Sequence, residues 1–522
     1  MKTFNLNILQ TSDVHGYIYP YSYADSKNAN HGFAKLHTLI KSLRTENTIL
    51  IDTGDTIQGS PFTYFHAKYF KNQKNPITKI MNIMKYDYVT IGNHEFNYGR
   101  EYMNHYYNGL KAKILNANIL KKDTKEPLFG LRYDIRDYQN GPKIATVGVT
   151  THYIPNWEQP EHIADLHIKD AFLTVQKLIK EIKETEQPDF IIVNYHGGFE
   201  RDPETGEITE IFTGENQGYM MMEEIPSINL LLTGHQHMLT SGKHKNTTYI
   251  QPSFNGQMLG QAKVKFELID KEWQIVDTSV MLHSVEKIVP SKEVLEVVEV
   301  EEEKTQKWLD KPIGHLSNGD LLITDPLKDR IKKHPLVTLI NQIQLDYTDA
   351  EISVTSLGNF VSGFKQDITM RHLVSTYVYP NTLVVKALDK ESLLKSLEKT
   401  ASFFEVANGK IVFSTKYTYP KLKLYDYDMF DGISYTINLS KPVGKRIEDV
   451  MFKGEPLHFN KLYKVVMNNY RASGGGEYFW LKDMKTIGES QTDFVEIMTD
   501  YIMKHKILTI NHEDNIKIKM HS

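Results

Sequence analysis

Seven side chains in the first half of the sequence have the types and spacing of metal ligands. Two pairs, an Asp-x-His and a His-x-His, each place two donors two residues apart. A carboxylate behind a Thr-Gly turn can bridge two ions, and an amide oxygen and a further imidazole complete the set. The candidate ligands are Asp13, His15, Asp55, Asn93, His196, His235 and His237.

The chemistry of this set points to hydrolysis. The sequence contains no cysteine, which excludes thiolate ligands, a cysteine nucleophile and a disulfide framework. Carboxylate, amide and imidazole donors favour Mn, Zn, Fe or Co over Ca without choosing among them. Two such ions about 3.5–4 Å apart would lower the pKa of a bridging water and hold it for in-line attack on phosphorus. We therefore expect a two-metal hydrolase of phosphate esters.

Each group of candidate ligands follows a short apolar run rich in β-branched residues. Such runs, bounded by polar turn residues, predict buried strands, and amphipathic helical patterns lie between them, as over 170–186. This alternation predicts an α/β fold, in which ligands gather where strands end. We expect all the groups to share one edge, and the two-residue period of a strand to point Asp13 and His15 the same way. The predicted strands cover 4–10, 48–51, 88–91, 190–193 and 228–232.

The motifs together resemble a known family. The combination of Asp13-Val14-His15, Gly54-Asp55, Gly92-Asn93-His94-Glu95, His196 and Gly234-His235-Gln236-His237 is similar to the calcineurin-like metallophosphoesterases. The stretches 11–16 and 92–99 further resemble the 5'-nucleotidase branch, which carries an added C-terminal domain and typically acts on nucleotides. The resemblance implies an N-terminal four-layer αββα sandwich and a smaller α/β C-terminal domain.

The resemblance also assigns roles to these residues. His94 would contact the phosphoryl group, where an imidazolium can stabilise developing charge or protonate the leaving oxygen. Nucleotidases of the family often pair this histidine with an aspartate three residues later, but here Asn97 completes the catalytic pair. An amide orients the ring without raising its pKa, so we expect His94 to act chiefly as a charge stabiliser. The implied ligands are Asp13, His15, Asp55 and His237 for one ion and Asn93, His196, His235 and the bridging Asp55 for the other.

An acidic stretch with a helical pattern begins near residue 290 and marks a change in the sequence. At 522 residues the chain exceeds the usual size of a single core, so two domains are expected. We predict a phosphoesterase domain over 1–288, a linker helix over 289–311 and a substrate-binding domain over 312–522. The acidic run 299–303 is interpreted as a solvated helix face. A strand around 383–385 and a helix over 390–400 indicate a second α/β mixture.

By the same resemblance, the C-terminal domain would bind the nucleoside. The stretch 468–476 is similar to a loop whose aromatic residue, here Tyr470, stacks on the base. Tyr425 or Tyr427 would provide the opposing ring, and two such rings gain roughly 1–3 kcal/mol per base. No Gly-Lys-Ser/Thr follows the glycines at 474–476, which excludes a phosphate-binding loop of the nucleotide-triphosphatase type. Lys365 and Arg371 are weaker candidates for contact with the phosphate.

Composition limits the partners. The formal net charge of −4 gives no electrostatic footprint for a nucleic-acid polymer or an anionic membrane. No run of about 18 apolar residues and no signal sequence is visible. We expect a cytoplasmic protein, a monomer or weak oligomer, whose partner is a small nucleotide substrate.

The leading hypothesis is a 2',3'-cyclic nucleotide phosphodiesterase and 3'-nucleotidase, because Asn97 at its position resembles those members of the family. The alternatives are a 5'-nucleotidase and a hydrolase of UDP-sugars or dinucleotide pyrophosphates. From another class, a catalytically weak nucleotide-binding module is disfavoured, because a binding protein does not need seven metal ligands together with His94.

Overall fold

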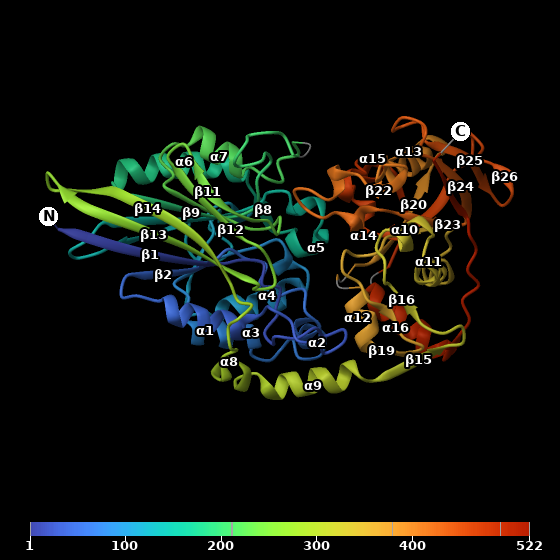
Figure 1. The fold of residues 1–522 in the computed structure, drawn as a ribbon, viewed down its shortest axis with the longest axis horizontal. Coiled ribbons are helices and arrows are strands. Elements are labelled where there is room, and N and C mark those ends of the chain that lie inside the picture. The colour runs from blue at the N-terminus through green and yellow to red at the C-terminus, as the bar shows by residue number, and fades with distance from the viewer. Residues whose placement is uncertain (1, 210–211, 378, 380, 491, 521–522) are drawn as a thin grey trace. The chain divides into compact units, whose positions relative to one another are not determined.

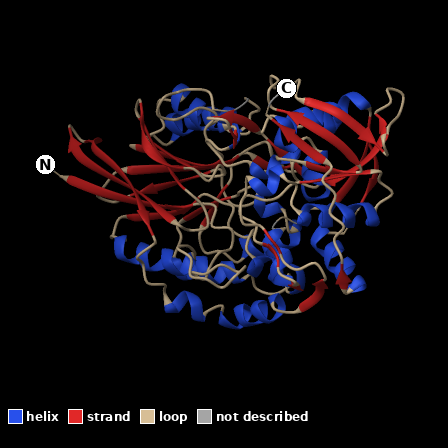
Figure 2. Cartoon of the chain, turned by 45° about the vertical axis from the view of Figure 1, so that its right-hand side comes forward, coloured by secondary structure: helices blue, strands red, loops and turns tan. Residues whose placement is uncertain are grey.

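The computed structural model describes residues 2–209, 212–377, 379, 381–490 and 492–520. The chain divides into two compact units, Met1–Thr305 and Gln306–Ser522, and both mix helices with β-sheets (Figures 1 and 2). Among the described residues, no helix is long and apolar enough to cross a membrane.

The first unit contains two six-stranded sheets. In each sheet four neighbouring strands run parallel. Antiparallel strands complete one edge of the first sheet and both edges of the second. The first sheet has the order β14 (Glu272–Ser284), β13 (Met258–Ile269), β1 (Thr3–Thr11), β2 (Thr48–Asp52), β3 (Tyr88–Thr90) and β4 (Lys113–Leu115). The second has the order β11 (Leu239–His244), β12 (Thr247–Pro252), β10 (Leu230–Thr233), β9 (Phe190–His196), β7 (Lys143–Thr150) and β6 (Tyr133–Asp137).

The sheets form the two inner layers of a sandwich. One apolar cluster joins the facing sides of the sheets, with Ile8 and Ile51 from the first sheet and Ile192 and Leu232 from the second. A second cluster joins the far side of the second sheet to helices α6 (Ala171–Thr185) and α7 (Gly218–Glu224). Helices α1 (Phe33–Leu43) and α3 (Pro76–Met84) lie along the other side (Figure 1). The predicted four-layer αββα sandwich is confirmed.

Helix α6 shows how the sequence specifies these layers. The Asp170 side chain accepts a hydrogen bond from the Leu173 amide and caps the N-terminus of the helix. Val175, Leu178 and Ile182 recur at helical spacing and are buried, while the charged residues between them face outward. The strands beneath are buried on both faces, which explains their continuous apolar sequences.

The five predicted strands of the first unit are present as β1, β2, β3, β9 and β10, but they do not belong to one sheet edge. The first three are neighbours in the first sheet, and the last two are neighbours in the second. Our single-edge expectation was wrong because periodicity identifies a strand without showing which sheet it joins.

Buried polar side chains hold the two sheets together near the ends of these strands. Asn194 of β9 donates to the Asp52 carbonyl oxygen at 2.9 Å and accepts from the Thr53 hydroxyl at 2.9 Å. Gln10 of β1 donates to the Thr53 hydroxyl at 2.8 Å and to the Thr233 carbonyl oxygen at 2.9 Å. These contacts link β1, β2, β9 and β10 at the point where the candidate ligands begin.

The region expected to be one linker helix contains two, α8 (Lys292–Glu296) and α9 (Glu299–Leu309). Its acidic run is not a solvated face throughout. Glu301 pairs with Lys79 at 2.6 Å, and Glu302 is only 5% exposed. The carboxylate of Glu302 accepts hydrogen bonds from the Tyr21 hydroxyl and, at 2.9 Å, from the Tyr23 hydroxyl. The interpretation failed because a tyrosine-rich loop remote in sequence covers this part of α9.

The second unit is built on a five-stranded sheet. The strand predicted around 383–385 belongs to this sheet as β20 (Leu383–Leu388), and the helix predicted over 390–400 is present as α13 (Lys390–Ala401). A four-stranded sheet and helices α11 (Pro335–Tyr347), α12 (Met370–Thr376) and α16 (Phe494–His505) complete its main elements. The five-stranded sheet has the order β23 (Met429–Asp431), β17 (Ile352–Thr355), β27 (Tyr463–Asn468), β20 (Leu383–Leu388) and β28 (Lys485–Glu489). The four-stranded sheet has the order β26 (Glu455–Pro456), β25 (Ile447–Phe452), β24 (Ile433–Asn438) and β30 (Ile516–Lys519).

The inter-sheet network predicts a large stability cost at Asn194. We expect Asn194→Ala to lower the free energy of unfolding by about 2–4 kcal/mol, because it opens a buried space and leaves polar partners without a hydrogen bond. Urea unfolding measures the change, and Asn140→Ala, at an exposed position, is the matched control. A loss at Asn194 no larger than that of the control would contradict the proposed role of the network.

Candidate metal centre

The seven predicted ligands converge where strands of the two sheets end. Asp13 and His15 follow β1, Asp55 follows β2 and Asn93 follows β3. His196 is the last residue of β9, and the His-x-His pair follows β10. The structure therefore brings together residues up to 224 positions apart, from His237 back to Asp13.

Five of these residues have a left-handed backbone, with φ between 52° and 69°. Asp13 and His15 do point toward a common site, as expected, but strand periodicity is not the cause, because both lie in this conformation beyond the end of β1. Outside glycine, such a backbone is uncommon and costs about 1 kcal/mol or more per residue. The strain is concentrated at positions whose side chains must turn back toward a common point. The five residues are Asp13, His15, Asp55, His235 and His237.

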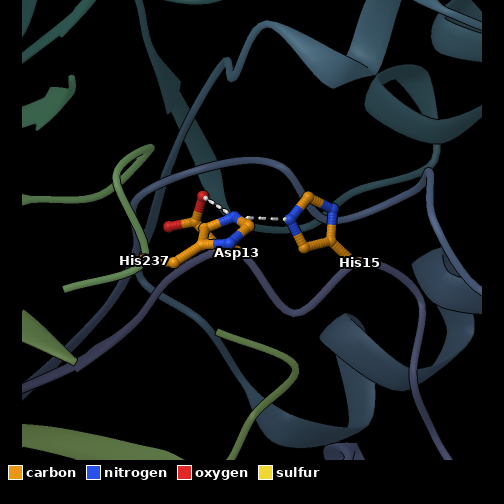
Figure 3. A group of neighbouring side chains, drawn as sticks. All are labelled: Asp13, His15 and His237. Carbon is orange, nitrogen blue, oxygen red and sulfur yellow. Dashed lines mark hydrogen bonds and ion pairs between the residues drawn. The ribbon is translucent and has the colours of Figure 1, made fainter. Parts of the chain in front are cut away.

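One group of potential ligands consists of Asp13, His15 and His237, which point toward one another (Figure 3). The Nε2 atoms of His15 and His237 are 3.1 Å apart, and His237 Nε2 lies 3.5 Å from Asp13 Oδ1. All the donor atoms of this group lie within 4.8 Å of one another, which suits coordination of a single cation.

The second group consists of Asp55, His196 and His235. Asp55 Oδ2 lies 3.2 Å from His196 Nε2, and among the described residues this buried oxygen has no hydrogen-bond partner. The Asn93 amide oxygen lies 3.0 Å from His196 Nε2 and 2.9 Å from His235 Nδ1. The two groups correspond to the sets implied for two separate ions, except that Asp55, implied as a ligand of both ions, belongs to the second group only. The amide oxygen of Asn93 joins that second group.

Three of the imidazoles are oriented by acceptors behind them. His15 Nδ1 faces the Gln58 carbonyl oxygen at 2.9 Å, and His196 Nδ1 faces the Thr53 carbonyl oxygen at 2.8 Å. His235 Nε2 faces the Glu215 carboxylate at 2.8 Å. Because a carbonyl or carboxylate oxygen accepts, the facing nitrogen donates, and in the neutral ring the other nitrogen directs its lone pair into the cluster. Imidazole must be in this form to bind a metal. Burial acts to lower the pKa of His196, but the Asp55 carboxylate raises it to about 9, so a metal ion bound there would displace a proton from the ring.

The electrostatics of the cluster also suit a cation. Burial raises the pKa of Asp13 to about 7 and lowers the pKa of His15 to about 4. Burial acts to raise the pKa of Asp55 as well, but the charges of His196 and His94 outweigh it and hold that pKa well below its usual range. An ion bound among these groups would offset the cost of burying the carboxylates.

Two further buried carboxylates shape the loops and were not assigned roles from the sequence. Glu95 accepts hydrogen bonds from the Gly92, Asp55 and Thr56 amides at 2.6, 3.0 and 2.5 Å, which fastens the turn after β2 to the turn after β3. Asp52 accepts from nearby hydroxyls and an amide within its own turn. A carboxylate bound to backbone amides has no sequence signature distinct from that of a metal ligand, so the sequence alone does not separate Asp52 and Glu95 from the ligands.

His94 lies beside the second group of ligands. Its amide donates to Asp55 Oδ1 at 2.8 Å, and its Nε2 atom lies 4.0 Å from Asp55 Oδ2. Its Nδ1 atom faces the Asn97 amide oxygen at 2.7 Å, as the catalytic pairing predicts. The side chain is 22% exposed, so the imidazole can face both the ligand cluster and a bound molecule.

The second unit places the predicted tyrosines in different environments. Tyr470 lies in the short helix α14 (Asn469–Ala472), and Tyr425 lies in a 3-10 turn over 424–426; both are partly exposed. Tyr427 is completely buried, with its ring 5.0 Å from that of Phe404 and 5.7 Å from that of Phe403. Tyr427 offers no ring face to a ligand, which leaves Tyr425 for that role.

A buried ion cluster connects the loops that carry Tyr425 and Tyr470. The Arg471 guanidinium lies 2.8 Å from Asp428 and 3.3 Å from Asp426. In the sequence, Asp426 directly follows Tyr425 and Arg471 directly follows Tyr470. Arg371, one of the weaker phosphate candidates, binds Asp310 at 2.6 Å and Gln306 at 2.7 Å. Within the second unit, Arg371 therefore has an anionic partner already.

Comparison with known proteins identifies the family. Residues 6–239 match the calcineurin-like phosphoesterases, and residues 312–483 match the 5'-nucleotidase C-terminal domain. The crystal structure of a Staphylococcus aureus protein, provisionally assigned as a 5'-nucleotidase and solved with alpha-ketoglutarate, has a TM-score of 0.91 and 32% identity, covering 99% of this chain and 100% of that one. This chain belongs to the 5'-nucleotidase family of calcineurin-like phosphoesterases.

Curated relatives in the family are more distant. The 2',3'-cyclic-nucleotide 2'-phosphodiesterase/3'-nucleotidase of Salmonella typhimurium is 26% identical, over 91% of this chain and 82% of the relative. The trifunctional nucleotide phosphoesterase protein YfkN of Bacillus subtilis is also 26% identical, over 98% of this chain. This chain spans only 39% of the length of YfkN.

The left-handed backbone at His237 predicts that a glycine variant is more stable than an alanine variant at this position. Glycine adopts a φ of 60° without strain, whereas alanine does not. In chelator-treated protein, we expect His237→Gly to be more stable than His237→Ala by about 1 kcal/mol, although both remove the imidazole.

Chemical denaturation of the two variants measures the difference. The matched control is the same pair of substitutions at His105, an exposed residue inside helix α4 (Gly99–Asn108), where alanine is expected to be the more stable by about 1 kcal/mol. The same order at both positions would show that the backbone at His237 is not strained.

Proposed function

We propose that this protein hydrolyses phosphate esters of nucleotides at two divalent metal ions, with 2',3'-cyclic nucleotides and 3'-nucleotides as its preferred substrates. The observation that carries the proposal is the convergence of two ligand groups in which three of the four imidazoles are held by an acceptor behind the ring and turn their other nitrogen into the cluster. His94 stands beside them with its imidazole partly exposed, where a bound phosphoryl group can reach it.

The residues present fit two cations. The first would be held by Asp13, His15 and His237, and the second by Asn93, His196 and His235, with Asp55 between them. The Asp55 oxygen that lacks a hydrogen-bond partner among the described residues supports its role as the bridge. When bound, divalent ions would lower the pKa of a water and polarise the phosphoryl oxygens. The donor set accepts Mn, Zn, Fe or Co.

The chain's own side chains account for the remaining steps. Glu95 and the carbonyl oxygens behind the histidines hold the ligand loops in place before any substrate arrives. His94 faces the ligand cluster through Nε2, so it can stabilise charge on the phosphoryl group or donate a proton to the leaving oxygen. Asn97 holds the opposite edge of the ring at 2.7 Å.

The order of substrates rests on two observations. Asn97 pairs with His94 where family nucleotidases often have aspartate, and the Salmonella relative carries the cyclic phosphodiesterase name. The Staphylococcus structure, provisionally a 5'-nucleotidase, supports 5'-nucleotides as the second candidate. UDP-sugars and dinucleotides remain the third, because they require a larger pocket around the same centre.

In the second unit, we propose that Tyr425 and Tyr470 stack on the nucleotide base. Both rings are partly exposed, and both lie next to members of the Arg471 ion cluster in sequence. Rings tolerate different bases, because every base has a face that can stack.

The two-metal centre predicts a defined response to metal removal. Purified protein is expected to hold about two divalent ions per chain and to lose activity when they are chelated. Asp55→Ala should lower kcat by at least about 1000-fold and remove at least one ion, because it deletes the bridge. Elemental analysis and phosphate release measure both, and exposed Glu224→Ala, in the same unit, is the control. Activity that survives both chelation and Asp55→Ala would refute a two-metal mechanism.

The substrate preference predicts the ranking of kcat/KM in a panel assayed with Mn²⁺. We expect 2',3'-cyclic and 3'-nucleotides to be hydrolysed at least about 10-fold more efficiently than 5'-nucleotides or UDP-glucose, a difference of roughly 1.4 kcal/mol in transition-state binding. Phosphate and nucleoside release are measured by chromatography. Failure on every cyclic substrate would eliminate the first choice, and failure on the whole panel would eliminate nucleotide hydrolysis.

The base-stacking proposal predicts a loss confined to substrates that have a base. Tyr470→Ala and Tyr425→Ala should each raise KM for nucleotides by about 5- to 150-fold, the equivalent of roughly 1–3 kcal/mol. Hydrolysis of p-nitrophenyl phosphate should be unchanged. Tyr347→Ala, at an exposed position of α11, is the control. Equal effects on both kinds of substrate would argue against stacking.

A further inference from the structure

We propose that Glu158 is a positioning residue for His94, acting through Asn97 in a hydrogen-bonded row of three side chains. The inference rests on the proposed function, in which His94 faces the phosphoryl group. Glu158 lies in the segment between β7 and the short helix α5 (Pro160–Ile163), more than 60 residues from His94, and no sequence motif marks it.

The row is continuous within the first unit. His94 Nδ1 faces Asn97 Oδ1 at 2.7 Å, and Asn97 Nδ2 donates to Glu158 Oε2 at 2.8 Å. Both distances are those of well-formed hydrogen bonds. The Glu158 side chain is only 4% exposed, so solvent does not compete for the carboxylate.

The chemistry of the carboxylate sets the direction of both bonds. An ionised carboxylate only accepts, so the Asn97 atom that faces Glu158 must be the NH₂ group. The amide oxygen then faces His94 and accepts the Nδ1 proton. His94 Nε2 is left pointing toward the ligand cluster, where it lies 4.0 Å from Asp55 Oδ2. Without Glu158, the two ends of the Asn97 amide could exchange places and turn a donor toward Nδ1.

Glu158 is itself held in place by two partners. Its Oε1 atom accepts from the Gln159 amide at 2.9 Å and pairs with His162 Nδ1 at 2.7 Å. Burial acts to lower the pKa of His162, but the hydrogen bond and charge of Glu158 raise it overall. The adjacent Trp157 stacks on His235, with ring centroids 5.3 Å apart, which fastens the segment to the metal centre.

The arrangement accounts for an amide at position 97. Asn97 cannot supply a negative charge to the imidazole, but it passes on the orienting effect of the carboxylate behind it. A histidine oriented by a carboxylate is a recurrent device for holding the ring in one tautomer. Here the carboxylate of Glu158 orients His94 through the amide of Asn97.

The test exchanges the amide and the carboxylate between positions 97 and 158. In Asn97→Asp, two carboxylates face each other across 2.8 Å, and we expect kcat for nucleotides to fall by at least about 100-fold. In Glu158→Gln, the orientation of Asn97 is no longer enforced, and we expect a fall of about 10-fold with KM within about twofold. In the double variant, the amide now at position 158 can donate to the carboxylate now at position 97, which accepts from His94, so kcat should recover above both single variants.

Four further measurements and variants separate positioning from folding. Urea midpoints are recorded for every variant, and kcat is expressed per folded protein. Exposed Glu161→Gln, which removes a neighbouring charge outside the row, is the matched control and should leave kcat unchanged. Hydrolysis of p-nitrophenyl phosphate should be less affected than that of nucleotides, because its leaving group needs little help from His94. Glu158→Asp, which keeps the charge with a shorter reach, should lie between Glu158→Gln and the wild type.

The outcomes distinguish the inference from the proposed function. A wild-type protein without nucleotide hydrolysis would refute the proposed function. An active wild type in which Glu158→Gln and Asn97→Asp retain full kcat would overturn the positioning role alone. A double variant no better than the worse single variant would also overturn it, because a residue needed only for packing gives no rescue.

Discussion

The first unit depends on the burial of several carboxylates in one small region. Asp13, Asp52, Asp55 and Glu95 are each at most 1% exposed, and water therefore stabilises none of their charges. Each needs a substitute for water. For Asp52 and Glu95 the substitutes are hydroxyl and amide donors of nearby turns. Asp13 and Asp55 face histidine nitrogens, and Asp55 keeps an oxygen without a hydrogen-bond partner among the described residues. Asp13 and Asp55 each accept a backbone amide as well, from His235 and His94. The ligand carboxylates differ from the structural ones in that they also face the imidazoles of the cluster.

Much of this site could be predicted from the sequence, because a ligand that follows a strand has a recognisable context. The seven candidate ligands were identifiable from their position after apolar runs, whereas the roles of His94 and Asn97 were implied by the resemblance to the family. The geometry of the site was less predictable from the sequence. Strand periodicity could not reveal that Asp13 and His15 leave β1 in a left-handed conformation. The assignment of strands to two sheets could not be predicted either, since it depends on contacts between segments far apart in the chain.

Residues that act behind the ligands were beyond the reach of sequence patterns. Glu215 and Glu158 belong to loops with no periodicity, and each works through a single hydrogen bond to a residue far away in the sequence. Glu302 was misinterpreted for the same reason, because its partners Tyr21 and Tyr23 are about 280 positions away. In the second unit, burial separated Tyr427 from Tyr425, although the two are only two residues apart. Their surroundings, and not their residue type, determine which of them a ligand can reach.

At the five ligand positions with a left-handed backbone, the residue that favours stability differs from the residue that the metal centre needs. Five side chains needed for the metal centre occupy backbone conformations that glycine adopts more easily. Directed evolution that selects only for heat resistance would therefore be drawn toward these positions and would accept inactive proteins. Thermostabilisation of this scaffold requires a screen for turnover at every round, or a library in which these five codons are kept constant.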